Sequence, residues 1–227
     1  MRKAINLSYK NAIMVVMGYL ILQVPITFVL LVFFKTFFPD VNARSVYIFV
    51  VPTLAFTILV TYLTAKNKVS LRKLFCVNNA QLIYYQIAYL SGLMLYIVNS
   101  RIITPLVIKI GPQNNYFHIQ LYRQSVYATY YWWILFVIIF APIVEELLFR
   151  SIVLCGLIDN YRPEKAVFVV SVMFAVYHMN PFVLIQTFSL GIATGILIIR
   201  AKSVFPCIVL HIVYNGCSVI NKLILST

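Results

Sequence analysis

Acidic residues are the scarcest feature of this sequence. Only five of the 227 residues are Asp or Glu, and charged residues of either sign make up 10% of the chain. Hydrophobic residues make up 63%, and the mean hydropathy is +0.94. A soluble domain of this size could not bury so much apolar surface. We therefore expect an all-α, polytopic transmembrane helical bundle, because an open strand edge cannot be satisfied in lipid.

Cysteine and sequence repeats are also scarce. The four cysteines form no C-x-x-C pair and three of them lie in apolar runs, so we expect packing residues rather than disulfides or zinc ligands. No solenoid period, low-complexity segment or cleavable signal peptide is evident. The basic start "MRKAINLSYK" leads into an apolar run that is too long for a signal sequence.

Basic residues outnumber acidic ones by eighteen to five. They lie in short segments between apolar runs, which favours contact with anionic lipid headgroups over nucleic acid as a partner. Eleven of them fall on the side of the N-terminus, six fall on the opposite side, and Arg150 lies within a span. The positive-inside rule therefore predicts a multi-pass protein of the cell membrane with its N-terminus in the cytoplasm.

Seven apolar runs are candidates for transmembrane helices, because most approach the ~20 residues that cross a bilayer. They are Asn11–Phe34, Ser45–Ala65, Leu82–Thr104, Val126–Ile158, Lys165–Asn180, Phe182–Arg200 and Val204–Leu225. The polar segment Thr104–Arg123, with its "GPQNN" stretch, is interpreted as a loop. We divide this single membrane domain into a three-span region, residues 1–124, and a four-span region, residues 125–227.

The fourth run, Val126–Ile158, is too long for one crossing. Its 33 residues would extend ~50 Å as a straight helix, against a hydrocarbon core of ~30 Å. "YYWW" near its start is typical of an aromatic belt at the membrane surface, and "DNYRPEK" predicts a turn after it. In the resulting helical hairpin, Glu145 and His178 each lie 13 residues from the turn. The register therefore predicts that these two side chains lie at the same level.

Two adjacent acids, Glu145 and Glu146, lie in the middle of this apolar run, whereas the other three fall in predicted loops. A charge near the bilayer centre costs at least a few kcal/mol. Arg150 follows Glu146 at i+4, so those two can form an ion pair on one helix face. Glu145 points about 100° away, and we expect it to face an internal cavity. An inert buried network of all three residues is an equal alternative on this motif alone.

Two histidines lie in later apolar runs, while His118 falls in the predicted loop. His178 follows Phe174 by one turn, and His211 precedes Asn215 by one turn. Glu145 and His178 could hold a water between them, and His211 and Asn215 could supply donors to an oxyanion. Each histidine could instead be a packing residue. A zinc site of Glu145, His178 and His211 is a weaker alternative, because H-E-x-x-H is absent.

The stretches "EELLFR", "FAVYH" and "HIVYN" resemble, in order, the E-E-x-x-x-R, F-x-x-x-H and H-x-x-x-N motifs of the CPBP family of CAAX proteases and bacteriocin-processing or immunity proteins. The resemblance covers about Ala141–Asn215. It implies an intramembrane glutamate endopeptidase that works without metal or cofactor. It further implies Glu145 as the base assisted by His178, His211 and Asn215 as the oxyanion site, and Glu146, Arg150 and Phe174 as supporting residues.

We therefore predict an endopeptidase that cuts a peptide precursor or the tail of a membrane protein. Some members of the CPBP family serve as immunity proteins, so binding of a peptide toxin in the membrane, with or without proteolysis, is the alternative. A transporter with an ionisable cluster is a third hypothesis. The absence of an evident inverted repeat argues against the transporter.

Overall fold

The structure is a computed structural model, and it describes residues 5–37, 44–110 and 134–226. These residues form helices and short connecting segments, which confirms the predicted all-α class. The α-helices are α1 (Tyr9–Phe37), α2 (Arg44–Asn67), α3 (Leu71–Leu74), α4 (Leu82–Val98), α5 (Thr104–Ile110), α8 (Ala141–Glu146), α9 (Cys155–Leu157), α10 (Pro163–Tyr177), α11 (Leu184–Ala201) and α12 (Phe205–Ser226). Within the described residues there are also three π-helical segments, η1 (Asn99–Ile103), η2 (Phe136–Phe140) and η3 (Leu147–Leu154), and the 3₁₀ turn η4 (Pro181–Val183).

Four helices within the described residues are long and apolar enough to cross a membrane, where seven crossings were predicted. They are Tyr9–Phe37, Phe49–Asn67, Leu82–Val107 and Pro181–Ala201, and Phe205–Asn221 is a shorter apolar helix. These four correspond to the predicted first, second, third and sixth spans. The predicted fifth span is the 15-residue helix α10, which reaches about 22 Å and so falls short of the ~30 Å hydrocarbon core.

The polar segment interpreted as a loop begins later than predicted, because Thr104–Ile110 forms α5. The helix runs through Pro105, the second residue of α5, directly after the π-helical turn η1. The rest of this segment, His118, the "YYWW" stretch and the predicted boundary at residues 124 and 125 lie outside the described residues.

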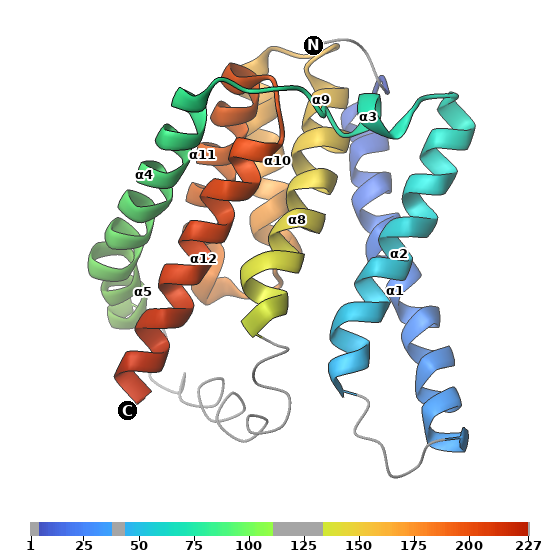
Figure 1. The fold of residues 1–227 in the computed structure, drawn as a ribbon, viewed down its shortest axis with the longest axis horizontal. Coiled ribbons are helices and arrows are strands. Elements are labelled where there is room, and N and C mark those ends of the chain that lie inside the picture. The colour runs from blue at the N-terminus through green and yellow to red at the C-terminus, as the bar shows by residue number, and fades with distance from the viewer. Residues whose placement is uncertain (1–4, 38–43, 111–133, 227) are drawn as a thin grey trace.

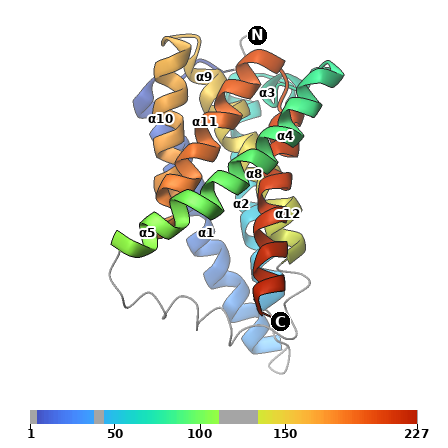
Figure 2. The same ribbon diagram turned by 90° about the vertical axis from the view of Figure 1, so that its left-hand side faces the viewer.

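The helices alternate in direction along the bundle (Figure 1). The antiparallel pair α1 and α2 lies on one side, α8, α10, α11 and α12 lie in the middle, and α4 and α5 lie on the far side from α1 (Figures 1 and 2). The two termini lie at opposite ends of the bundle (Figure 1). The assignment of the N-terminal end to the cytoplasm stays a prediction.

Small residues bring α10 and α11 into close contact. A Cβ atom on Gly191 of α11 would meet the Cβ of Ser171 at 2.9 Å, and one on Gly195 would meet a methyl group of Val167 at 2.9 Å. This glycine pair at i and i+4 lets two membrane helices approach closely. The contact holds α10 against α11, the helix that carries Thr194. The motif histidine His178 is the C-cap residue of α10.

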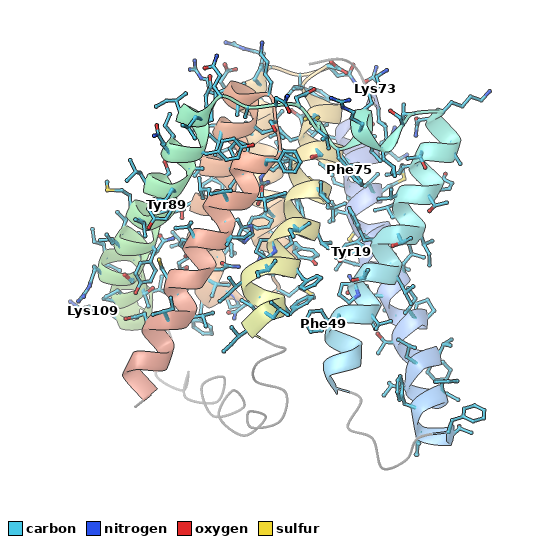
Figure 3. All side chains as sticks on the ribbon, viewed as in Figure 1. Tyr19, Phe49, Lys73, Phe75, Tyr89 and Lys109 are labelled. Atoms are coloured by element: carbon cyan, nitrogen blue, oxygen red, sulfur yellow. The ribbon has the colours of Figure 1, made fainter. Side chains whose placement is uncertain are left out.

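The connecting segment between α3 and α4 is held against one end of the bundle. Ser151 donates a hydrogen bond to the Phe75 carbonyl at 2.9 Å, and the Cys76 and Cys155 sulfur atoms lie 3.1 Å apart. Asn78 donates to the Lys202 carbonyl at 2.8 Å. Figure 3 shows Phe75 and Lys73 at this end of the molecule. The cysteine pair was not foreseen from the sequence, which indicated only packing roles.

Candidate active site

One continuous helix, from residue 134 to residue 157, carries the paired glutamates. It alternates between π-helical and α-helical turns, and the short α8 that contains Glu145 and Glu146 lies between η2 and η3. Pro142 is the second residue of α8 and follows η2, just as Pro105 follows η1. The run is thus helical, as predicted, but η2 and η3 interrupt its α-helical turns, and Pro142 lies two residues beyond η2. Such π-helical turns occur frequently at functional sites.

Glu146 and Arg150 form the predicted ion pair. The Arg150 Nε atom lies 3.0 Å from Glu146 Oε2, and both side chains are fully buried. The Nε–H itself donates to Thr194 Oγ1 of α11 at 2.7 Å, and the guanidinium carbon lies 4.8 Å from the centre of the Phe174 ring. Arg150 therefore ties the helix of the glutamates to both α10 and α11.

His211 of α12 joins the two glutamates. Its Nδ1 lies 2.9 Å from Glu146 Oε1, and its Nε2 lies 3.8 Å from Glu145 Oε2. Because a carboxylate accepts, the Nδ1–H is the donor in the shorter contact. Glu146 is thus engaged on both oxygens, by Arg150 and by His211. The sequence had placed His211 with Asn215 alone and did not indicate this contact.

His178, at the end of α10, has its ring orientation set by the preceding turn. Its Nδ1 lies 2.8 Å from the Phe174 carbonyl. A carbonyl can only accept, so Nδ1 carries the proton and Nε2 of the neutral ring keeps a lone pair. The predicted register, with Glu145 and His178 at the same level, stays a prediction.

Phe174 forms the packing centre between the two histidines. Its ring meets the His178 ring edge-on, with 4.8 Å between the ring centres, and the His211 ring at 5.9 Å. It also packs against Phe149 at 5.1 Å and lies beneath Arg150. An aromatic ring in this position fixes both imidazoles and the guanidinium at once, which fits the supporting role predicted for Phe174.

Asn215 lies one turn beyond His211, as predicted, but its amide is engaged elsewhere. Its Nδ2 donates to the Val137 carbonyl of η2 at 2.9 Å. An amide nitrogen has two N–H groups, so one donor is used here. Asn215 thereby links α12 to the π-helical segment that precedes the glutamates.

A pocket of about 530 Å³ lies between α1, α2 and the helix of the glutamates. Its wall includes Glu145, Tyr177 of α10, and Tyr19, Gln23 and Thr27 of α1. Of the four predicted catalytic residues, only Glu145 is among the described residues that line it, although Val137, the partner of Asn215, lines it as well. Phe49 of α2, which Figure 3 labels, packs edge-on against Phe136 and Phe140 of η2 beside the pocket.

Several residues of this site were missed from the sequence. Thr194 is a polar residue in the apolar stretch "GIATGILI", and that contrast was its one available signal. Gln23 and Thr27 are polar residues within the first apolar run, and Tyr177 directly precedes His178. Their roles depend on contacts between helices that no spacing along one helix can indicate.

No group of three His, Cys, Asp or Glu side chains in the described ranges has an arrangement suited to a metal ion. The alternative zinc site of Glu145, His178 and His211 is not formed by this geometry. His211 directs Nδ1 to Glu146 and His178 directs Nδ1 to a backbone carbonyl. The zinc alternative is therefore left to a chelator experiment.

Comparison with known proteins gives one match. Residues 127–217 match the family model described as type II CAAX prenyl endopeptidase Rce1-like. Neither the curated proteins nor the solved structures contain a match to the chain. The matched segment contains every motif residue, from Glu145 to Asn215, and it ends within α12. The chain therefore carries, at residues 127–217, a domain of the Rce1-like type II CAAX prenyl endopeptidase family, which belongs to the CPBP proteins and consists of glutamate intramembrane proteases.

Proposed function

We propose that this protein is an intramembrane endopeptidase that hydrolyses a peptide bond in a peptide precursor or in the tail of a membrane protein. One observation carries the proposal. Glu146 is engaged by Arg150 and His211, whereas the adjacent Glu145 lines the pocket. The two acids thereby differ in role, and Glu145 is the carboxylate that a substrate can reach.

In the proposed reaction, a water lies between Glu145 and His178. One of its hydrogens faces the Glu145 carboxylate and the other faces the lone pair on His178 Nε2, so an oxygen lone pair points at the substrate. Glu145 takes the first proton while the water oxygen bonds to the carbonyl carbon of the substrate. The resulting tetrahedral intermediate collapses when Glu145 returns that proton to the amide nitrogen. The carbon–nitrogen bond then breaks and leaves a carboxylic acid and an amine.

The oxyanion of the intermediate needs donors, and we assign them to Asn215 and His211. Asn215 retains one amide N–H beyond the bond to Val137. His211 can donate from Nε2 only when its ring carries both protons, because Nδ1–H already faces Glu146. Glu146, Arg150 and Phe174 act as supporting residues that hold these groups in place.

The family and the four apolar helices make this a multi-pass membrane protein. We propose that the N-terminal end faces the cytoplasm, on the basis of the excess of Lys and Arg on that side. A cysteine-accessibility experiment with a reagent that does not cross the membrane would test this orientation at engineered positions near each terminus.

The test of the enzymatic proposal uses purified protein in lipid vesicles and a pool of synthetic hydrophobic peptides of randomised sequence. Mass spectrometry detects new peptide termini. Glu145→Gln should abolish cleavage because it removes the base and keeps the shape, and Asn215→Ala should lower turnover about 10²- to 10³-fold. Glu164→Gln is the matched control, since Glu164 is an exposed acid that pairs only loosely with Arg162 at 3.8 Å.

Two outcomes would contradict the proposal. Cleavage by Glu145→Gln within tenfold of the wild type would exclude Glu145 as the base. The alternative function, immunity by binding alone, predicts that the wild type captures peptides without cutting them. In cells, it further predicts that Glu145→Gln and Asn215→Ala keep full protection against a peptide toxin at matched expression.

A further inference from the structure

We infer that the polar face of α1 formed by Tyr19, Gln23 and Thr27, here called the α1 stripe, binds the backbone of the substrate opposite Glu145, with Gln23 as the main positioning residue. This inference rests on the proposed function and adds to it the wall that holds the peptide. The α1 stripe lies outside residues 127–217, and none of its residues belongs to the three motifs.

The spacing of the stripe places it on one face of α1. Its residues follow each other at i, i+4 and i+8, which aligns them along a helix. The lipid-exposed side of α1 is apolar, with Val24 70% and Phe28 67% accessible. Figure 3 shows Tyr19 on the side of α1 that faces α8. The polar face is therefore turned away from lipid and toward the pocket that contains Glu145.

The members of the stripe differ in how firmly they are engaged. Tyr19 is buried, and its ring stacks on Tyr177 with 6.3 Å between the ring centres. The Thr27 hydroxyl donates a hydrogen bond to the Gln23 carbonyl at 2.7 Å. The Gln23 amide reaches the Tyr19 carbonyl only at 3.5 Å, a long contact. Tyr19 thus holds α1 against α10, whereas the Gln23 amide can exchange a weak contact for better ones.

An extended peptide supplies those better contacts. A protease must meet its substrate in an extended form, and inside a membrane each exposed N–H and C=O of such a segment needs a partner. A glutamine amide carries both a donor and an acceptor, so it can pair with the C=O and the N–H of one peptide residue. The other pocket wall, which includes Val51, Pro52 and Phe136, is apolar and suits the substrate side chains.

The size of the pocket agrees with this occupant. A volume of about 530 Å³ lies in the range of ligand sites and suits a few residues of peptide. A helical segment would satisfy its own backbone groups and leave the Gln23 amide unpaired. The α1 stripe therefore favours a locally unwound segment, and it predicts selection for backbone conformation more than for one particular side chain.

The first arm of the test measures kinetics with the best-cleaved peptide from the randomised pool. Gln23→Leu keeps the size of the side chain and removes the amide. We expect KM to rise about three- to tenfold, as the loss of a neutral hydrogen bond or two predicts, with kcat changed less than twofold and melting unchanged. Gln23→Asn should restore part of the affinity. Val24→Leu, on the lipid-facing side of the same helix, is the matched control and should leave KM unchanged.

The second arm measures peptide binding in the absence of cleavage. A photoreactive benzoylphenylalanine is placed at Thr27, or at the lipid-exposed Phe28 as control, in protein that also carries Glu145→Gln. Peptides from the pool should crosslink at position 27 at least fivefold more than at position 28. Equal crosslinking at both positions, or an unchanged KM in Gln23→Leu while the wild type cleaves, would refute the inference and leave the proposed function intact. Capture at position 27, together with a wild-type protein that cleaves no peptide of the pool, would support the α1 stripe and overturn the proposed function.

Discussion

Removal of the Arg150 side chain is the sharpest test of how the site is held together. Arg150 is fully buried, pairs with Glu146 at 3.0 Å, donates to Thr194 at 2.7 Å and covers the Phe174 ring. Its two terminal nitrogens have no hydrogen-bond partner among the described residues. The guanidinium is therefore held mainly by charge and by the aromatic face, and Arg150→Ala removes both.

The size of the effect follows from what is left behind. Glu146 would keep its contact with His211 but lose its cation, and an uncompensated buried charge costs about 3–5 kcal/mol. For a chain of this length, about 3 kcal/mol corresponds to a fall in melting temperature on the order of 6–12 °C. The double variant Glu146→Gln with Arg150→Met removes both charges. It should recover most of this loss, because hydrophobic replacement of a whole buried pair is often neutral.

The assay is thermal unfolding in detergent, followed by intrinsic fluorescence, beside cleavage of the peptide pool. The expected order of stability is wild type, then the double variant, then Arg150→Ala, and a double-mutant cycle gives the coupling between the two residues. An inactive Arg150→Ala protein that melts within about 2 °C of the wild type would refute the structural role. Arg150 would then belong to the chemistry, with its unpartnered nitrogens as the reactive face.

Three further predictions concern packing and metal. Gly191→Ala should lower the melting temperature because its Cβ would meet Ser171 at 2.9 Å. Gly18→Ala is the control, because a Cβ there would meet no atom within 4 Å. Equal melting temperatures of the two variants would contradict the close contact between α10 and α11. Mild oxidation should link Cys76 to Cys155, whose sulfur atoms lie 3.1 Å apart, and mass spectrometry would detect the linked peptides. Hydrogen bonding with Cys155 lowers the pKa of the Cys76 thiol, so the reaction should proceed below the pH that an ordinary thiol needs. Cleavage should survive dialysis against a strong chelator, and its loss with recovery on added zinc would favour the metal alternative.

Interactions within one helix could be predicted from the sequence. The i+4 spacing of Glu146 and Arg150 predicted an ion pair that the structure contains. The different direction of Glu145 predicted a cavity-facing side chain, and Glu145 lines the pocket. Helical periodicity is a property of the backbone, so it holds wherever a helix forms. The same rule, applied on both sides of a short turn, predicts the level of His178 relative to Glu145, and this stays a prediction.

Interactions between helices distant in the sequence could not be predicted. The contact of His211 with Glu146 spans 65 residues, and that of Arg150 with Thr194 spans 44. Each depends on the rotation of one helix against another, which is set by local packing such as that of Gly191 on Ser171. The described residues show four of the seven predicted crossings, for a related reason. A run of apolar residues is expected both for a helix in lipid and for a segment packed inside protein. Composition therefore could not show that the helix α10 has only 15 residues.

The charge balance of the site explains why the supporting residues matter to the proposed reaction. With neutral histidines, Glu145, Glu146 and Arg150 carry one net negative charge, and it resides on Glu145 because Arg150 balances Glu146. When Glu145 takes the proton of the attacking water, that charge moves to the oxyanion of the substrate. The first step therefore relocates a buried charge over a few ångströms, on the scale of the site, rather than creating one. Its barrier depends on how much better Asn215 holds the charge than Glu145 did, because a neutral His211 directs its one N–H to Glu146. A variant that frees Glu146 from Arg150 would place a second negative charge beside this path, and it would slow catalysis even where the fold survives.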